Sequence, residues 1–332
     1  TFNAVVGGMG LLGAITRVKL KLKPMNSGRL RVKCLTARNI DEQFDLCEAH
    51  LGQSDYLVSW VDCMSDGESL GRGQIHAANY LEPGEDPLGA STFHVENQIL
   101  PSRILGVPKS ALWRIMKYFM NDPGTRLVNG LKYLSSKRQH GKSYLQSHVG
   151  FAFLLDYVPN WRLAYGSNGF IQYQIFVPDG KARSCFRDVL RISHEAGLRP
   201  YLGVLKRHRP DGFLMTHALD GWSFALDFKV PKGGRVPLWE HTDRLTDRVL
   251  AAGGKFYFAK DAVLTPDQVL QAYGPDAIRQ FFELKQVHDP SNLLTNDLWE
   301  RAIRPLEEAV FNRLGEDGGA LLPSAASAEA AT

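Results

Sequence analysis

Residues 7–24 have the sequence GGMGLLGAITRVKLKLKP, a glycine cluster that runs directly into alternating apolar and basic residues. This period-two alternation is typical of a half-buried strand, here with a basic outer face, and Pro24 ends it because proline has no N–H for a ladder. Glycines before a strand allow positive φ or a close approach of the backbone to a ligand. A Rossmann-type fingerprint needs a strand before its glycines, which is the reverse of this order. The alternative to a ligand-binding role for these glycines is a tight turn that leads into an edge strand.

The composition is ordinary for a globular protein of one large or two smaller domains. The 332 residues are 44% hydrophobic and 22% charged, with a formal net charge of +4. Lys and Arg are scattered except at 17–23 and 137–142. Such a distribution favours a solvated basic face over a nucleic-acid footprint, so we expect no nucleic-acid partner. Four cysteines lie far apart without a Cys-x-x-Cys pair, which predicts reduced and mostly buried thiols.

The chain shows no targeting or membrane segment. Its first residues lack the apolar run of a signal peptide, and no stretch contains the roughly 18–20 apolar residues that span a bilayer. We therefore expect a cytoplasmic protein without an integral membrane segment. Because the sequence starts without methionine and within a predicted domain, the loss of an N-terminal targeting signal stays open. The alternatives to a cytoplasmic location are therefore the membrane periphery and the periplasmic face of the membrane. We expect no metal, since His140 and His148 have no third ligand in register.

Hydrophobic periodicity and turn residues divide most of the chain into strands and helices. Strands are predicted at 30–35, 55–62, 71–80, 170–177, 200–206, 222–230 and 255–259. Helices are predicted at 39–51, 180–196, 239–253, 266–273 and 275–286, and 109–134 is predicted to be helical with an interruption at Asp122-Pro123-Gly124. Residues 82–108 are predicted as loop and 135–147 as a polar, mobile segment. The order strand–helix–strand–strand indicates an α+β fold class, with an antiparallel sheet flanked by helices.

Two glutamines on one strand are candidates for binding a polyol. Gln172 and Gln174 share a face of the predicted strand, opposite the apolar side chains of Ile171 and Tyr173. Two amides supply both donors and acceptors, and the hydroxyls of a polyol need both. A solvent-exposed polar face is the alternative interpretation.

Two lysines are candidates for charged groups in a site. Lys206 ends an apolar strand and therefore needs a partner or a cavity, unless its chain extends to solvent beside Arg207. Lys260 follows a helix that stops at Gly253 and Gly254, and it lies at the end of a short predicted strand. The alternative for Lys260 is a surface ion pair with the next residue, which contributes little stability.

A set of ordered segments between residues 4 and 303 carries a family resemblance. Besides the glycine cluster, these segments are Trp60-Val61-Asp62, Gly71-Arg72-Gly73, NGFIQYQ at 168–174, Val177-Pro178, Val204-Leu205-Lys206, Gly221-Trp222, Asp227-Phe228, GGKFYFAKD at 253–261, Asp289-Pro290 and Asn296-Asp297-Leu298. Together they resemble the vanillyl-alcohol oxidase / p-cresol methylhydroxylase superfamily of FAD-linked oxidoreductases. Within it, they are most similar to the decaprenylphosphoryl-β-D-ribose oxidase group and its sugar-oxidising relatives. Residues 85–150 match poorly.

The resemblance implies an FAD cofactor and a role for each candidate residue. Lys260 would lie near the isoalloxazine ring and the substrate, and Lys206 near the reacting carbon, as catalytic residues. The implied substrate-binding residues are Gln172, Gln174, Trp60 and Ser223, and the implied cofactor-binding residues are Gly10, Gly13, Ile15 and Tyr257. The implied reaction is hydride transfer from a CH–OH group of a sugar-like substrate, free or linked to a lipid phosphate, to flavin N5.

The chain departs from the family at three positions. Ala225 stands where close family members have the cysteine that covalent inhibitors attack, and Ala152 or Phe153 stands near a pocket tyrosine. His208 replaces a residue that is usually aromatic. These departures bear on the identity of the substrate rather than on the flavin chemistry.

The resemblance also implies a domain organisation. Residues 1–25 would end an FAD-binding domain, 26–254 would form the substrate domain, 255–312 would return to the FAD-binding domain, and 313–332 would be a disordered tail. Because the N-terminal FAD-binding half is missing from this sequence, we expect weak or no flavin binding by the isolated chain. Two alternatives remain: a non-catalytic binding or assembly module, such as the second half of a split flavoenzyme with a flavin-domain partner, and an aldonolactone-type oxidase.

Overall fold

A computed structural model describes residues 1–104, 106–153 and 158–312, and the chain divides into two compact units. The first, here called the sheet unit, comprises residues 16–211 and 217–263. The second, here called the terminal unit, comprises residues 1–15, residues 212–216 and the chain from residue 264 onward. Each unit is described by itself.

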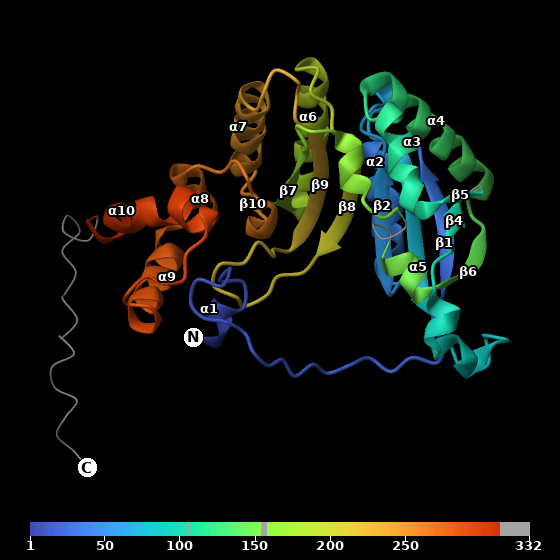
Figure 1. Ribbon diagram of the computed structural model, residues 1–332, viewed down its shortest axis with the longest axis horizontal. Helices are drawn as coiled ribbons and strands as arrows, with labels where there is room; N and C mark the ends of the chain where they lie inside the picture. Colours follow the sequence, from blue (N-terminus) through green and yellow to red (C-terminus); the bar gives the residue numbers. More distant parts are fainter. Residues whose placement is uncertain (105, 154–157, 313–332) are drawn as a thin grey trace, which may run out of the picture. The chain divides into compact units, whose positions relative to one another are not determined.

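An eight-stranded antiparallel sheet forms the framework of the sheet unit, in the order β10-β7-β9-β8-β2-β3-β1-β6 (Figure 1). Its strands are β1 (Arg29–Ala37), β2 (Tyr56–Val61), β3 (Gly73–Tyr80), β6 (Ser143–Ser147), β7 (Phe170–Pro178), β8 (Leu202–His208), β9 (Gly221–Lys229) and β10 (Lys255–Phe256). A separate two-stranded hairpin joins β4 (Arg103–Ile104) and β5 (Val107–Pro108). The α+β class and the antiparallel sheet expected from the sequence are confirmed.

The sheet has two similar halves. β1, a helix, β2 and β3 follow one another in one half, and β7, a helix, β8 and β9 follow in the same order in the other. The halves join where β2 pairs with β8. This arrangement puts the ends of β7, β8 and β9 next to one another, and those strands carry Gln172, Gln174, Lys206 and Ser223.

Helices pack on both faces of the sheet unit. They are α2 (Ile40–His50), α3 (Lys109–Phe119), α4 (Asp122–Gln139), α5 (His148–Ala152), α6 (Asp179–Glu195) and α7 (Val236–Ala251), with short 3-10 turns η1 (Gly67–Ser69), η2 (Gly89–Phe93), η3 (Val95–Gln98), η5 (Trp161–Tyr165) and η6 (Phe258–Lys260). Gln43 of α2 donates to the backbone oxygen of Trp60 and accepts from the Ser59 hydroxyl, whereas Lys132 of α4 lies over the Trp60 ring. Because neighbouring strand residues point to opposite faces, α2 and α4 lie on opposite faces of the sheet.

Local sequence explains where these helices begin. Asn39 caps α2 by accepting a hydrogen bond from the backbone N–H of Glu42 at 2.9 Å. Asn121 caps α4 in the same way, and Pro123 occupies its first turn. The interruption predicted at Asp122-Pro123-Gly124 is therefore confirmed, because the Asn121 cap starts a second helix there.

The terminal unit combines the glycine cluster with the C-terminal helices. Its elements are α1 (Phe2–Val5), α8 (Pro266–Tyr273), α9 (Pro275–His288), the π turn η7 (Trp299–Ile303), the 3-10 turn η8 (Arg304–Leu306) and α10 (Glu307–Asn312). Lys285 is 4% exposed, pairs with Asp289 at 2.5 Å and donates to the carbonyl oxygen of Leu11 at 2.9 Å. The cluster also receives a 3.1 Å hydrogen bond from the Asn296 amide to Met9. These contacts fix the glycine cluster within the terminal unit.

The predicted strand after the glycine cluster does not form. The turn is present, since Gly7, Gly10 and Gly13 have φ of 86°, 75° and 155°. However, residues 13–25 are in no strand, and their backbone makes no hydrogen bond with another described residue. Val18, Leu20 and Leu22 are 64%, 72% and 81% exposed. The prediction was wrong because a strand needs a partner for its N–H and C=O groups, and the described residues provide none.

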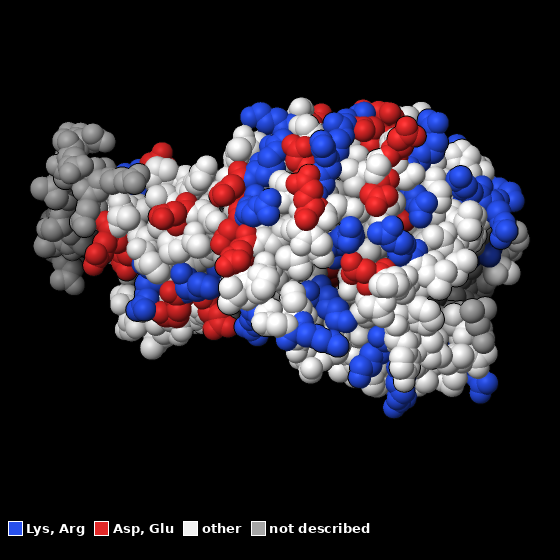
Figure 2. Space-filling view, turned by 90° about the horizontal axis from the view of Figure 1, so that it is seen from above, with Lys and Arg blue, Asp and Glu red and all other residues white. Residues whose placement is uncertain are grey.

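The cysteines and the surface agree with an ordinary globular protein. All four cysteines are free and buried, and burial raises the thiol pKa of Cys47 to about 12 and that of Cys185 to about 11. On the face shown in Figure 2, Lys and Arg lie interspersed with Asp and Glu. Across the described ranges, every helix is too short or too polar to cross a bilayer.

Candidate functional site

Four strands of the sheet unit bring candidate residues onto one face of the sheet. The register places Gln174 beside Ala225, Ala225 beside Val204, and Val204 beside Trp60. Opposite residues of antiparallel strands point to the same face, so these side chains form a row across β7, β9, β8 and β2. We call this face the site face.

Two further rows flank the first. Gln172 lies beside Asp227, and Ser223 lies beside Lys206. Because residues two apart in a strand share a face, Gln172 and Gln174 point the same way, as the sequence alternation predicted. The structure therefore brings these candidate residues to the site face together.

The Lys260 side chain reaches this face from η6. Its ammonium donates to Gln174 Oε1 at 2.8 Å and lies 5.4 Å from the centroid of the Tyr257 ring. The backbone N–H of Tyr257 donates to the Gln174 carbonyl at 3.2 Å, which fixes the turn against β7. Desolvation and the nearby ammonium of Lys206 lower the pKa of Lys260, whereas Asp227 opposes this shift.

A small depression, here called the amide hollow, lies between β7 and η6. Gln172, Gln174, Tyr257 and Lys260 are among the residues that line it. Its volume is about 10 Å³, which is room for about one water molecule. The two amides and the ammonium thus face one common space.

Asp227 is a second polar residue of β9 on this face, in addition to Ser223. The sequence offered both residues as the one that faces the pocket, and Ser223 was the predicted choice. The Asp227 carboxylate is 1% exposed and accepts from Gln172 Nε2 at 2.6 Å and from the Tyr165 hydroxyl at 3.4 Å. Burial raises the pKa of Asp227 to about 6, against the hydrogen bond from Gln172 and the charge of Lys260. The period-two pattern of GWSFALDFK already placed both residues of β9 on one face.

Ser223 lies near the edge of the site face, in contact with a histidine. Its side chain is 1% exposed, and its hydroxyl lies 2.7 Å from His208 Nε2. The His208 ring also packs 4.8 Å from the Phe176 ring. Burial, together with the nearby His217 and Lys206, lowers the pKa of His208 to about 4, so its ring is neutral at physiological pH.

Trp60 lies at the far end of the central row. It is 9% exposed, and the Lys132 ammonium of α4 lies 4.0 Å from its ring centroid. A cation over an indole face is attracted by the ring quadrupole. α4 therefore covers this indole.

The candidate flavin residues Gly10, Gly13 and Ile15 are in the terminal unit. Gly10 and Gly13 have positive φ, and a Cβ added to either would meet no atom within 4 Å. Ile15 is 59% exposed. The glycine backbone is thus accessible from outside the unit, which suits a close approach by a ligand.

An apolar groove adjoins the site face on the side of α3, α4 and η5. It has a volume of about 340 Å³, and its wall includes Phe119, Trp161, Tyr165, Leu202 and the Asp227 carboxylate. Tyr165 stacks on Phe170 with ring centroids 4.4 Å apart. Asp227 therefore lies between this groove and the amide hollow.

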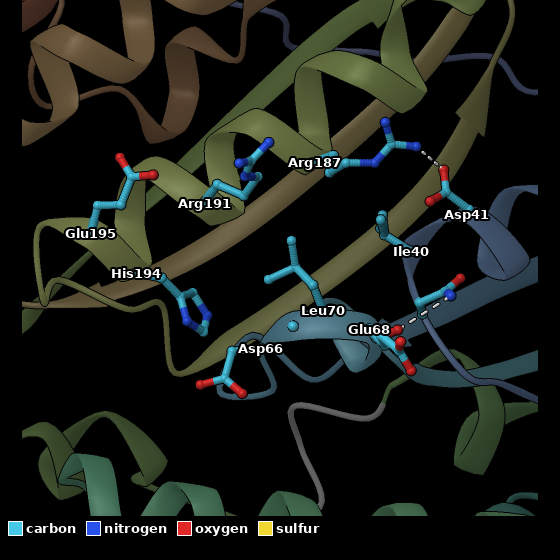
Figure 3. A pocket seen from close by; sticks show the side chains of 11 residues that line it. Ile40, Asp41, Asp66, Glu68, Leu70, Arg187, Arg191, His194 and Glu195 are labelled. Carbon is cyan, nitrogen blue, oxygen red and sulfur yellow. Dashed lines mark hydrogen bonds and ion pairs between the residues drawn. The ribbon is translucent and has the colours of Figure 1, made fainter.

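A charged cleft of about 490 Å³ lies between α2 and α6 (Figure 3). Arg187, Arg191 and His194 of α6 line one side, Asp41 of α2 pairs with Arg187, and Leu70 lies between them. The lining carries both signs of charge, with four carboxylates (Asp41, Asp66, Glu68 and Glu195) and two guanidiniums (Arg187 and Arg191). Within the described ranges, no group of three or more His, Cys, Asp or Glu side chains is placed to hold a metal ion.

Known proteins similar to this chain include the following two. The chain is 26% identical over 313 residues to decaprenylphosphoryl-β-D-ribose oxidase of Mycolicibacterium smegmatis. The aligned region covers 90% of this chain and 62% of that protein. It is also 26% identical over 314 residues to an uncharacterized protein in the mprA 5′ region of Streptomyces coelicolor, covering 90% of this chain and 80% of that protein. No family model matches the chain.

The fold and the site face define an α+β protein with a polar site on an antiparallel sheet. The chain is a distant homologue of decaprenylphosphoryl-β-D-ribose oxidase. The resemblance predicted from the sequence motifs is thus confirmed at this level.

Proposed function

We propose that this chain is part of an FAD-dependent oxidoreductase that oxidises a CH–OH group of a sugar-like substrate. The observation that carries the proposal is the amide hollow, where Lys260 contacts Gln174 beside Gln172 in a homologue of a ribose oxidase. Two amides offer the donors and acceptors that hydroxyl groups require. A cation next to them suits a reaction in which negative charge develops.

Each unit by itself has a feature that suits a flavin. In the terminal unit, Gly10 and Gly13 expose backbone with open space around it. In the sheet unit, Tyr257 offers a ring beside the Lys260 ammonium. A bound flavin would accept the hydride of the substrate. Lys260 is exposed in this chain, and it would stabilise negative charge on the reduced ring once flavin and substrate cover it. A charged group aimed at developing charge in such a dry site contributes about 3–4 kcal/mol.

The remaining candidate residues would position the substrate. Gln172 and Gln174 would bind hydroxyl groups, and Lys206 would add a second cation near the reacting carbon. Trp60 and Ser223 would bound the site further along the same face. Their shared face in the sheet register supports these roles.

We also propose that residues 1–25 and 255–312 belong to the flavin-binding part, and 26–254 to the substrate domain. The terminal unit supports this division, because it joins residues 1–15 with the chain from 264 onward. The chain spans 62% of the length of the M. smegmatis oxidase.

The direct test is flavin reduction by substrate. The purified chain is mixed with excess FAD, and bleaching of the flavin absorbance is followed after addition of methyl β-D-ribofuranoside or of polyprenyl-phosphoryl ribose in detergent. We expect bleaching that is lost in Lys260→Met and retained in Lys232→Met, an exposed lysine away from the site. Bleaching by the free sugar alone favours an aldonolactone-type oxidase, and equal bleaching in both variants contradicts the role of Lys260.

One observation favours a second candidate, an assembly module that completes a partner's flavin site. The exposed apolar side chains of Val18, Leu20 and Leu22 alternate with basic residues, a pattern suited to pairing with the edge of another sheet. The test is co-expression with the part of the M. smegmatis oxidase outside the matched region. A stable complex that depends on Leu20 and Leu22 supports this candidate, and turnover by the chain alone contradicts it.

A further inference from the structure

The two glutamines of the amide hollow are anchored by groups of opposite charge. Residues two apart in a strand are about 6.6 Å apart along it, so Gln172 and Gln174 present their amides side by side. An amide has a donor end and an acceptor end of nearly the same shape. Which end faces the hollow is therefore decided by what holds the other end.

Asp227 decides the orientation of Gln172. The Gln172 NH₂ group donates to Asp227 Oδ1 at 2.6 Å. A reversed amide would put its carbonyl oxygen against a carboxylate, two acceptors without a proton between them. The ionised carboxylate thus holds the NH₂ end, which leaves the carbonyl oxygen of Gln172 as the free end.

Lys260 decides the orientation of Gln174 in the opposite sense. The Lys260 ammonium donates to Gln174 Oε1 at 2.8 Å. A reversed amide would put an NH₂ group against an ammonium, two donors without an acceptor. The ammonium thus holds the carbonyl end, and the NH₂ group of Gln174 is the free end.

We propose that Asp227 is a positioning residue which, with Lys260, sets the two amides in opposite directions, so that the site face around the water-sized hollow offers an acceptor at Gln172 and donors at Gln174. The ligand that fits has a hydroxyl that donates on one side and an oxygen that accepts on the other, as two oxygens of a polyol do. Only this ligand class rests on the proposed function. The orientation of the amides rests on the contacts alone.

The geometry has a selective consequence. A site built around a buried hydrogen bond rejects an analogue that lacks the partner, because its own polar group is then left unpaired. A fluorine accepts weakly but does not donate. Replacing the hydroxyl that faces Gln172 by fluorine should therefore weaken binding about tenfold, and replacing the oxygen that faces Gln174 should weaken it less.

The amide orientation can be tested on the protein without a ligand. The chain is labelled with side-chain ¹⁵N-glutamine, and the NH₂ signals are followed between pH 4.5 and 8. The groups that face Asp227 are Gln172 of β7, Tyr165 of η5 and the ammonium of Lys260, and the carboxyl titrates near pH 6. We expect the Gln172 NH₂ signals to follow this titration, and the response to disappear in Asp227→Asn. Gln172 signals that ignore Asp227 overturn the proposal.

The compensating pair Gln172→Glu with Asp227→Asn separates orientation from folding. In the pair, the amide introduced at position 227 donates to the carboxylate introduced at position 172, whose second oxygen still offers an acceptor to the hollow. We expect Asp227→Asn alone to weaken binding of methyl β-D-ribofuranoside about tenfold by saturation-transfer NMR, and the pair to restore it. Asp247→Asn, on the outer side of α7, is the control that should bind like the parent chain.

Two outcomes of this experiment are decisive. A pair that binds no better than Asp227→Asn overturns the proposal. Absence of sugar binding in the parent chain, with the Gln172 titration present, upholds the orientation of the amides and contradicts the sugar-oxidase function.

Discussion

At the scale of single residues, Asp227 combines a structural cost with a positioning role. Its carboxyl is 1% exposed, and its pKa of about 6 lies above the ordinary value of 3.8. The folded chain therefore binds this proton more tightly than the unfolded chain does. The contribution of Asp227 to stability is greatest below pH 4 and is lost as the pH rises through 6.

This shift predicts a pH-dependent difference between the parent chain and Asp227→Asn. Two pKa units correspond to about 3 kcal/mol, so the stability of the parent relative to the variant should fall by about that amount between pH 4 and pH 7. Urea unfolding at a series of pH values measures it. Histidines titrate in the same range but are present in both proteins, so their effect cancels. A constant difference across this range contradicts a buried titrating carboxyl.

Lys260 is the residue whose charge the proposed reaction uses. Lys260→Met should lower turnover by about 100- to 1,000-fold, because it removes a group that contributes about 3–4 kcal/mol in the transition state. Lys260→Arg keeps the charge and should retain part of the activity. Stopped-flow flavin reduction measures the chemical step. Equal rates in Lys260→Met and the parent chain would exclude a catalytic role.

At the scale of elements, the sheet depends on close approach between strands at a few glycines. A Cβ on Gly73, at the start of β3, would lie 1.9 Å from the Trp60 carbonyl oxygen of β2. Backbone cannot yield as a flexible side chain does, so β2 and β3 would have to separate. In contrast, Gly130 in the middle of α4 has open space around the position of a Cβ.

These two glycines form a matched pair for a stability measurement. Gly73→Ala should destabilise the chain by several kcal/mol, on the order of the overpacking penalty of about 1–3 kcal/mol or more. Gly130→Ala should stabilise it by up to about 1 kcal/mol, because alanine favours a helix interior. Thermal unfolding checks both. Equal effects would show that the approach of β3 to β2 is not the constraint.

The same scale shows what the sequence could predict. Hydrophobic periodicity and turn residues located β7, β9 and α2, and the α+β class followed from the order of the elements. β6 was predicted as part of a mobile segment, because SYLQS is short and polar, and it becomes a strand only by pairing with Arg29–Lys33 of β1. The Asp227–Gln172 contact joins residues 55 positions apart, and no local pattern carries such a pairing.

At the scale of the whole molecule, the segment from residue 14 to residue 24 differs from the rest. Its apolar side chains are exposed, and its backbone makes no hydrogen bond to another part of the described chain. A strand-like segment of this kind gains stability only when a second sheet supplies the missing pairs. Whether the backbone of this segment is hydrogen-bonded therefore indicates whether the chain is alone or assembled with a partner.

Hydrogen exchange should show this directly. In the isolated chain, amides 16–23 should exchange at nearly unprotected rates, and on assembly with a flavin-binding partner they should become protected. Leu20→Asp with Leu22→Asp should leave the melting temperature of the isolated chain unchanged and abolish the protection. Slow exchange of these amides in the isolated monomer would contradict the structure described for this segment.

The burial of all four native thiols has a practical consequence. Maleimides attack surface thiolates, and none of the native sulfurs is offered to them. A single cysteine introduced at position 20 or 22 should accordingly be the only residue that a fluorophore maleimide labels, without prior replacement of the four native cysteines. The natural sequence with this one added cysteine can therefore carry a fluorophore that reports when the segment binds a partner.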